Sequence, residues 1–351
     1  MGVRIKDIAR LAEVSSAAVS LVLNNKPGVG AEKRERIIQI ARELGHEGPK
    51  ALLPLRSAAE AIRFLHIARH GHTVNRDHDV FIADYIEGLG QGSRDLGLNL
   101  GIETFKATPI EKIIESALAM EAAGFIVLGT ELSEEDVAAF TVLPRPLVFI
   151  DTYLDFLPFD FVDMNNEDSV FTIVSAFAAR GHRRIGMVKA TIETRNFKLR
   201  EEGFIASLAR MRIPFDPALI FAVDSTFHGA YEEMSVLLEK GIELPAALFC
   251  ANDVIACGCI RAFRHAGLRV PDDVSVIGFD DLPISAISDP PLTTIRVSKA
   301  EIGRMAVQLL ATRLRSDAAA PPVKTLIGGQ LVERRSVCDM TNTDESKGGA
   351  Q

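Results

Sequence analysis

The residues whose types and spacing can do chemistry begin near the N-terminus, between Ile5 and Asn24. Apolar residues recur there at helical spacing in two short runs, Ile8, Leu11 and Ala12, then Val19, Val22 and Leu23. Ser15 can cap the second run. The spacing predicts two short helices joined by a tight turn, and the second helix turns four side chains outward: Ser16, Ala17, Ser20 and Leu21. Such outward side chains can reach base edges in the major groove of DNA.

Charge separates this N-terminal head from the rest of the chain. Residues 1–56 hold ten Lys/Arg and six Asp/Glu, a net charge of +4, whereas the whole chain carries −8, so the remainder carries −12. A basic head on an acidic body is expected of a protein that touches phosphates at one end only. The alternative, a small helical bundle with no nucleic-acid role, does not explain this division.

A second group of chemically capable residues lies between His70 and Phe81, where three histidines and two aspartates occur: His70, His72, His78, Asp77 and Asp79. A metal site is one interpretation. No spacing places these side chains on one helix face, so a solvated loop is the favoured interpretation. We therefore expect no metal and no cofactor.

Signatures of catalysis are missing from the sequence. The glycines of GLGQG at 88–92 lie within a helical stretch, whereas a dinucleotide fingerprint follows a strand directly. No nucleophile elbow, P-loop or paired-acid pattern occurs. The cysteines fit no zinc pattern and are expected to be reduced thiols: Cys250, Cys257, Cys259 and Cys338. The sequence therefore disfavours an enzyme.

The elements that must position these residues form a head, a linker and a body. A third helix is expected over 31–44, and the Gly- and Pro-rich segment that follows predicts a linker. From Arg63 onward short apolar runs alternate with amphipathic stretches, which predicts doubly wound parallel sheets with helices on both faces. No apolar run approaches the roughly 20 residues of a membrane span. Three segments are expected to cross between two lobes: Asp160–Asn165, Ser288–Thr294 and Asp317–Lys324.

The head sequence IKDIARLAEVSSAAVSLVLNN, followed by EKRERIIQIARELG, resembles the helix-turn-helix of the lactose-repressor (LacI/GalR) family of bacterial transcription regulators. The resemblance continues in order through ARGHRRIGMV (179–188), ANDVIACG (251–258), VPDDVSVIGFDDL (270–282), PPLTTIRVSKAEIG (290–303) and LVERRSV (331–337). It implies a helix-turn-helix head and a two-lobed body like a periplasmic sugar-binding protein, with an effector cleft between the lobes.

Domain boundaries follow from this match. We expect a DNA-binding domain at 1–48, a hinge or linker at 49–60, and an effector-binding and dimerisation body at 61–340. Within the body the first lobe is expected over 61–161 and 292–322, and the second lobe over 162–291 and 323–340. The polar tail, 341–351, is expected to be disordered.

The resemblance also implies site residues. In the head and linker, the positions expected to contact DNA are Lys6, Ser15, Ser16, Ala17, Ser20, Leu21, Asn24, Leu55 and Arg56. In the body, Arg200 in LREEGF, Asn252 in ANDV and Asp280 in GFDDL match effector-binding positions, and these types suit polyol recognition. An Asp pair after a strand is also common turn chemistry. Asp151 and Asp163 end strands that are expected to face the cleft, and the first lobe is expected to add His72, Asn75 and Arg76.

The sequence departs from the family pattern at three positions, and each departure leads to a prediction. Leu21 stands where the family has an arginine, and leucine offers only apolar contact where arginine reads guanine. Arg4 stands where a capping hydroxyl is usual, a loss of about 1 kcal/mol. Leu55 falls at the position that inserts into the minor groove, but Pro54 precedes it, and a proline inside a helix costs about 3 kcal/mol.

The sequence thus predicts a cytoplasmic, dimeric, sequence-specific DNA-binding regulator, a repressor, whose body binds a sugar or sugar derivative. Its partners are a double-stranded DNA operator, that effector and a second copy of the chain, with no membrane. No leucine-rich heptads follow residue 340, so tetramers are not expected. The alternatives are a periplasmic-type sugar carrier, which the basic head and the absence of a signal peptide oppose, and a sugar-acting enzyme.

Overall fold

The computed structural model describes residues 5–23, 28–44, 61–315 and 320–341. The chain divides into two compact units, Met1–Glu60 and Ala61–Gln351. Several predictions concern residues outside this description: the DNA contacts of Asn24, Leu55 and Arg56, the missing cap at Arg4, the hinge at 49–60 and most of the tail. Among the described residues, no helix is both long and apolar enough to span a membrane.

The head holds the predicted helices α1 (Ile5–Leu11), α2 (Ser16–Leu23) and α3 (Ala31–Glu43). α2 begins after Ser15, whose hydroxyl oxygen accepts a hydrogen bond from the backbone N–H of Ala18 at 3.1 Å, as a capping serine does. The apolar faces of the three helices meet in one small core: Ile8, Ala9, Ala12, Val19, Val22, Leu23, Ile37 and Ala41. The spacing in the sequence therefore predicted these three helices correctly.

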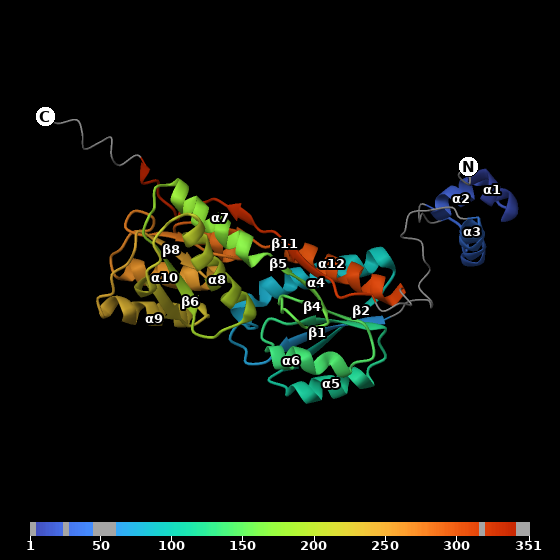
Figure 1. The fold of residues 1–351 in the computed structure, drawn as a ribbon, viewed down its shortest axis with the longest axis horizontal. Helices are drawn as coiled ribbons and strands as arrows, with labels where there is room; N and C mark the ends of the chain where they lie inside the picture. The colour runs from blue at the N-terminus through green and yellow to red at the C-terminus, as the bar shows by residue number, and fades with distance from the viewer. Residues whose placement is uncertain (1–4, 24–27, 45–60, 316–319, 342–351) are drawn as a thin grey trace. The chain divides into compact units, whose positions relative to one another are not determined.

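The first lobe of the body is a six-stranded parallel sheet in the order β11-β5-β4-β3-β1-β2. Its strands are β1 (Ala61–Ala68), β2 (Asn99–Lys106), β3 (Gly124–Leu128), β4 (Leu147–Ile150), β5 (Asp160–Met164) and β11 (Lys324–Ile327). Helices cover both faces, with α4 and α12 on one side and α5 and α6 on the other (Figure 1). Their bounds are α4 (Asp79–Leu96), α5 (Ile110–Ala119), α6 (Glu134–Ala139) and α12 (Lys299–Arg315), with single 3-10 turns at Arg76–His78 and Phe140–Val142.

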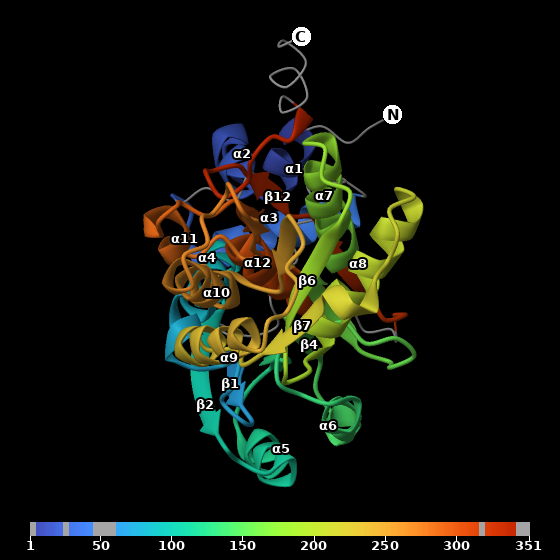
Figure 2. The ribbon, with the colours of Figure 1, turned by 90° about the vertical axis from the view of Figure 1, so that its left-hand side faces the viewer.

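The second lobe is a four-stranded parallel sheet in the order β7-β6-β8-β9. Its strands are β6 (Ile185–Ala190), β7 (Ile220–Val223), β8 (Ala247–Cys250) and β9 (Ser275–Ile277). α7 pairs with α8 on one face and α9 with α10 on the other (Figure 2). The helices are α7 (Asn166–Ala179), α8 (Arg195–Arg210), α9 (Phe227–Glu239), α10 (Asp253–His265) and α11 (Pro283–Ile287), with a 3-10 turn at Pro217–Leu219. The antiparallel pair β10 (Thr294–Arg296) and β12 (Gln330–Val332) completes the body.

The chain crosses between the lobes three times, at places that differ in part from the expected ones. The first crossing is Asn165, between β5 and α7, inside the expected segment. The second lies at residues 297–298, after the expected segment, because Ile277 bridges Thr293 and holds that stretch to the second lobe. The third lies at 328–329, since β11 still pairs with β5 in the first sheet. Glycine and proline residues indicate where loops lie in a sequence, but the pairing of strands decides which sheet a segment joins.

Two of the three glycines of GLGQG, Gly88 and Gly92, serve helix packing. A Cβ atom built on Gly88 would lie 2.1 Å from the backbone oxygen of Ala300 on α12, and one on Gly303 would lie 2.6 Å from that of Tyr85 on α4. These positions let the backbones of α4 and α12 approach closely. The helical interpretation of this segment is confirmed.

Candidate functional site

The outward face of α2 carries the predicted DNA-reading residues. Ser16 and Ala17 are exposed, Ser20 and Leu21 are half-buried, and Val19 and Val22 are buried in the head core. Lys6 and Ser15 are exposed as well. This placement leaves small polar and apolar groups available to base edges.

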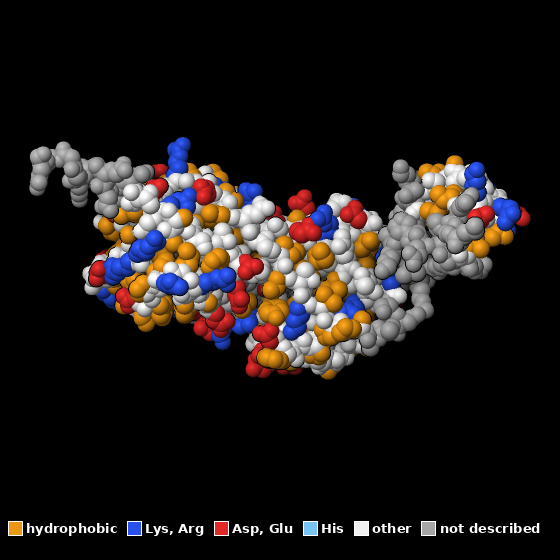
Figure 3. Space-filling view, turned by 45° about the horizontal axis from the view of Figure 1, so that its top comes forward, with side chains coloured by type: hydrophobic (Ala, Val, Ile, Leu, Met, Phe, Trp, Pro, Cys, Tyr) orange, Lys and Arg blue, Asp and Glu red, His pale blue; other side chains and the backbone are white. Residues whose placement is uncertain are grey.

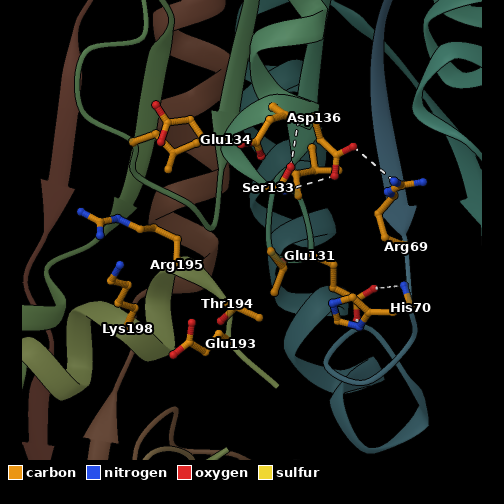
Figure 4. A pocket seen from close by; sticks show the side chains of 14 residues that line it. Arg69, His70, Glu131, Ser133, Glu134, Asp136, Glu193, Thr194, Arg195 and Lys198 are labelled. Atoms are coloured by element: carbon orange, nitrogen blue, oxygen red, sulfur yellow. Dashed lines mark hydrogen bonds and ion pairs between the residues drawn. The ribbon is translucent and has the colours of Figure 1, made fainter. Parts of the chain in front are cut away.

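The body has a pocket of about 870 Å³ between its lobes (Figure 4). The first lobe lines it with Arg69, His70, Leu154 and residues 130–136, which are the loop after β3 and the start of α6. The second lobe lines it with the start of α8, residues 193–195 and Lys198. Thr194 caps that helix, its hydroxyl oxygen accepting from the backbone N–H of Phe197 at 3.3 Å. The pocket is therefore an interlobe cleft with a charged wall. Outside it, acidic and basic side chains are interspersed over the visible face of the body (Figure 3).

Arg200 projects from α8 into the protein interior and is 3% exposed. Its Nε donates to Asn166 Oδ1 at 3.0 Å and its Nη1 donates to the backbone oxygen of Ala251 at 2.6 Å. The guanidinium lies over the ring of Phe279, 3.7 Å from the centroid, and its Nη2 is 3.5 Å from Asp280 Oδ1. Stacking and several donors hold the planar fork in one orientation.

Asp280 and Asp281 have different roles. Asp280 is buried with a φ of 114°, its backbone oxygen accepts from Lys299 Nζ at 2.8 Å, and its Oδ1 has no hydrogen-bond partner. Burial raises the pKa of Asp280 to about 6, against the opposing charges of Arg200 and Lys299. Asp281 instead accepts from Arg296 and Arg334, at 2.7 and 2.6 Å. Asp281 is thus held by two ion pairs, while Asp280 lies beside Arg200.

Asp151 and Asp163 add two more buried carboxyl groups near Arg200. Asp151 accepts from the Tyr85 hydroxyl at 2.8 Å and from the Thr130 hydroxyl, and burial raises its pKa to about 6. Asp163 has one oxygen, Oδ2, without a partner, and burial together with the charge of Asp151 raises its pKa well above the usual range. The Arg200 charge opposes both shifts. Tyr85 is a residue that the sequence reasoning missed, because nothing in its helical pattern distinguishes it from a core aromatic.

Amides connect the two lobes across this cluster. Asn196 Nδ2 donates to the backbone oxygen of Asp151 at 3.1 Å, and Asn166 Nδ2 donates to Asn196 Oδ1 at 2.9 Å. Asn166 in turn accepts from Arg200. A continuous polar network therefore runs from the end of β4 in the first lobe to Arg200 in the second.

The segment before α4 brings a different residue into contact with the second lobe from those expected. Arg76 is exposed, Asn75 is half-buried and bonds within its own turn, and the side chain of half-buried His72 accepts no bond from the second lobe in the described residues. His78 is buried and its Nε2 lies 3.0 Å from Asn252 Nδ2. No sequence signal separates His78 from its neighbours, because its burial depends on the other lobe. Among the described residues no group of three or more His, Cys, Asp and Glu side chains could hold a metal ion.

Comparison with known proteins agrees with this architecture. Residues 4–47 match the bacterial regulatory proteins of the lacI family, and residues 174–337 match the periplasmic binding protein-like domain. The PurR repressor of Pasteurella multocida is 30% identical over 95% of this chain and 98% of its own length. The CytR repressor of Escherichia coli K12 is 30% identical over 88% and 89%, and the ribose operon repressor of Haemophilus influenzae is 29% identical over 89% and 92%.

Solved structures show the same fold. The Lac repressor dimer bound to operator and the anti-inducer ONPF superposes with a TM-score of 0.70 at 25% identity, covering 96% of this chain and 100% of that one. The CelR–cellobiose complex superposes with a TM-score of 0.71 at 22% identity, covering 95% and 99%. The head, the interlobe cleft and these relatives together show that the chain belongs to the lacI family of bacterial regulatory proteins, which are effector-controlled DNA-binding regulators and not enzymes.

Proposed function

We propose that this regulator is a cytoplasmic, dimeric repressor whose effector is a sugar or sugar derivative bound between the lobes beside Arg200. Arg200, Asp280, Asn252 and Asp151 form the proposed effector-binding set. His72, Asn75 and Arg76 are proposed to contact the effector when it is bound.

The observation that carries this proposal is the Asp280 oxygen beside Arg200 that accepts no hydrogen bond. Asp280 Oδ1 and Asp163 Oδ2 are buried and accept no hydrogen bond, although buried polar atoms ordinarily do. An effector hydroxyl can donate to such an oxygen, while the fixed guanidinium of Arg200 donates to the oxygen of the same or a neighbouring hydroxyl. This combination suits a neutral polyol. The name of the ribose operon repressor supports the same class.

Operator binding is proposed for the α2 face of two heads in a dimer, and the similar Lac repressor structure is that of a dimer bound to operator. Two-fold symmetry of the protein then implies a pseudo-palindromic site with half-sites related by the same symmetry. Effector binding changes the lobe geometry and so the affinity for the operator. A carrier without DNA function is disfavoured by the helix-turn-helix head and by its repressor relatives.

A thermal-shift screen of the full chain against monosaccharides, disaccharides and nucleosides tests the effector class. A ligand at about 100 times its dissociation constant stabilises the folded protein by about 2.7 kcal/mol, which such a screen detects easily. We expect a hit among the sugars that weakens in the Asp280→Asn variant and persists in Lys240→Ala, a substitution on the exposed end of α9. A hit among nucleosides alone narrows the effector to a sugar derivative, whereas no stabilisation by any of these compounds contradicts the sugar assignment.

A further inference from the structure

The segment from His70 to His78, here called the strap, links the two lobes. It leaves β1 of the first lobe and reaches three residues of the second lobe. Ser225 Oγ donates to the backbone oxygen of His72 at 2.6 Å, and the backbone N–H of Phe227 donates to Asp77 Oδ2 at 3.0 Å. Asn252 Nδ2 and His78 Nε2 are 3.0 Å apart. The strap is thus attached to α9 and α10 of the opposite lobe.

Glu131 fixes the beginning of the strap to the first lobe. Its side chain is fully buried, and it accepts four backbone N–H groups at 2.8–3.0 Å, those of His70, Gly71, Thr73 and Val74. Burial alone favours the protonated acid, but these hydrogen bonds outweigh it and lower the pKa of Glu131. An ionised Glu131 therefore holds the His70 end of the strap to the first lobe. The contacts at the His78 end then decide how the strap lies against the second lobe.

A chain of hydrogen bonds with one defined direction joins the strap to α10. Asn252 Oδ1 accepts from the backbone N–H of Ile255 at 2.8 Å and caps the helix, so its amide nitrogen must face His78. Nε2 of His78 is then the acceptor, and Nδ1 carries the proton. That proton is directed at Asn75 Oδ1, 3.2 Å away, and Asn75 Nδ2 donates to the backbone oxygen of His72 at 2.8 Å. Every member has one donor facing one acceptor only if His78 is neutral.

We propose that His78 is the positioning residue of an interlobe latch, in which its neutral Nδ1–H tautomer holds the strap against Asn252 and so sets the separation of the lobes at the cleft. Protonation of Nε2 places two donors face to face, and Asn252 cannot rotate its amide without losing the cap of α10. The latch therefore opens when His78 gains a proton or loses its acceptor.

The charged groups around His78 agree with a neutral imidazole. Asp77 and Asp79 on its own segment and Glu131 from the loop after β3 favour the protonated form, whereas Arg200 from α8 opposes it. Burial is the largest influence, and the pKa of His78 falls to about 4. Because this histidine is neutral when folded, the latch is intact above the ordinary histidine pKa of 6.5 and is lost as the pH falls toward 4.

Substitution of His78 by leucine and by glutamine distinguishes the proposed hydrogen-bonding role of this side chain from a role in packing alone. Glutamine can place its carbonyl oxygen near the position of Nε2 and accept from Asn252, whereas leucine fills the space but accepts nothing. We expect His78→Leu to raise the rate of tryptic cleavage after the exposed Arg76 by about tenfold or more, since a buried amide loses its partner. His78→Gln is expected to stay close to the parent rate. His228→Leu, on the exposed start of α9, is the matched control.

Nitrogen NMR of the full chain labelled with ¹⁵N-histidine reports the tautomer and charge of each histidine, which a purely packing role of His78 does not determine. We expect one histidine to show a protonated Nδ1 and an unprotonated Nε2, to remain neutral at pH 5, and to vanish from the spectrum of His78→Gln. An Nε2–H tautomer at His78, or a leucine variant cleaved no faster than the glutamine variant, overturns the proposal. If His78→Leu does not fold, the tautomer and the His78→Gln cleavage rate still decide it. None of these measurements requires an effector.

Discussion

Nη2 of Arg200 lies 3.5 Å from Oδ1 of Asp280, and both residues are 3% exposed. The two groups are close enough to interact electrostatically, yet the carboxylate oxygen receives no hydrogen bond. Three further carboxyl groups, those of Asp151, Asp163 and Asp253, are buried in the same region. Arg200 thus lies beside Asp280 among several buried carboxyl groups, and this relationship governs the first prediction below.

The first prediction concerns effector binding. Arg200→Ala and Asp280→Ala should each lower effector affinity at least tenfold, because a hydrogen bond to a charged group contributes about 1.5–3 kcal/mol. Operator affinity without effector should barely change, since the head is a separate compact unit. Calorimetry with a sugar from the screen and a gel-shift titration measure the two properties separately.

Arg200→Ala also leaves buried carboxyl groups without their cation, so its folding must be checked by thermal unfolding. Asp280→Asn preserves the side-chain shape and is the milder test. Asp272→Asn, at an exposed ion pair with Arg269, is the matched control. Parent affinity for effector in both Asp280 variants would falsify the cleft assignment and point to the strap.

The second prediction concerns pH. Burial, and next the charge of Asp280, raise the pKa of Asp253 to about 7, despite hydrogen bonds from Ser285, Thr294 and Leu282. An acid whose pKa is higher in the folded chain stabilises the fold most below its ordinary pKa of 3.8, and this stability is lost as the pH rises through about 7. The melting temperature of the parent minus that of Asp253→Asn should therefore fall from pH 5 to pH 8. A constant difference, matching that of Asp272→Asn, contradicts this.

The third prediction concerns the contact between α4 and α12. Gly88→Ala should destabilise the body by about 1–3 kcal/mol, because its Cβ meets the backbone of Ala300, which cannot move aside. Gly90→Ala on the same helix meets only the end of the Arg94 side chain, at 3.3 Å, and should stabilise by up to about 1 kcal/mol through helix propensity. Denaturant unfolding of the two variants compares them directly. Equal effects of the two substitutions are incompatible with this account.

The fourth prediction concerns operator choice. Leu21 lies on the outward side of α2 with Ser16 and Ala17, and leucine can contact only apolar groups such as a thymine methyl. Leu21→Arg should shift the preferred base at one position of each half-site toward guanine, with a discrimination of about 1–3 kcal/mol. Selection of bound sites from random DNA measures this for parent and variant. Identical consensus sites would remove Leu21 from the reading surface.

The sequence by itself determined the elements and the class of protein. Periodicity predicted the three head helices, since their apolar stripes recur every three to four residues and need only one another for burial. The alternation of apolar runs with amphipathic stretches predicted the parallel sheets. The ordered motifs predicted the family, which the relatives then confirmed. Local spacing is sufficient for these features because each is decided within one or two neighbouring elements.

Only the tertiary structure decided which residues meet between the lobes. His78 is buried because Asn252, 174 positions away, closes over it, while its neighbour Arg76 stays exposed. Asp280 and Asp281 are adjacent and identical in type, but one lies beside Arg200 and the other pairs with Arg296 and Arg334. The third lobe crossing likewise follows from the pairing of β11 with β5. Burial and charge pairing at these positions depend on groups distant in sequence, so no local pattern can specify them.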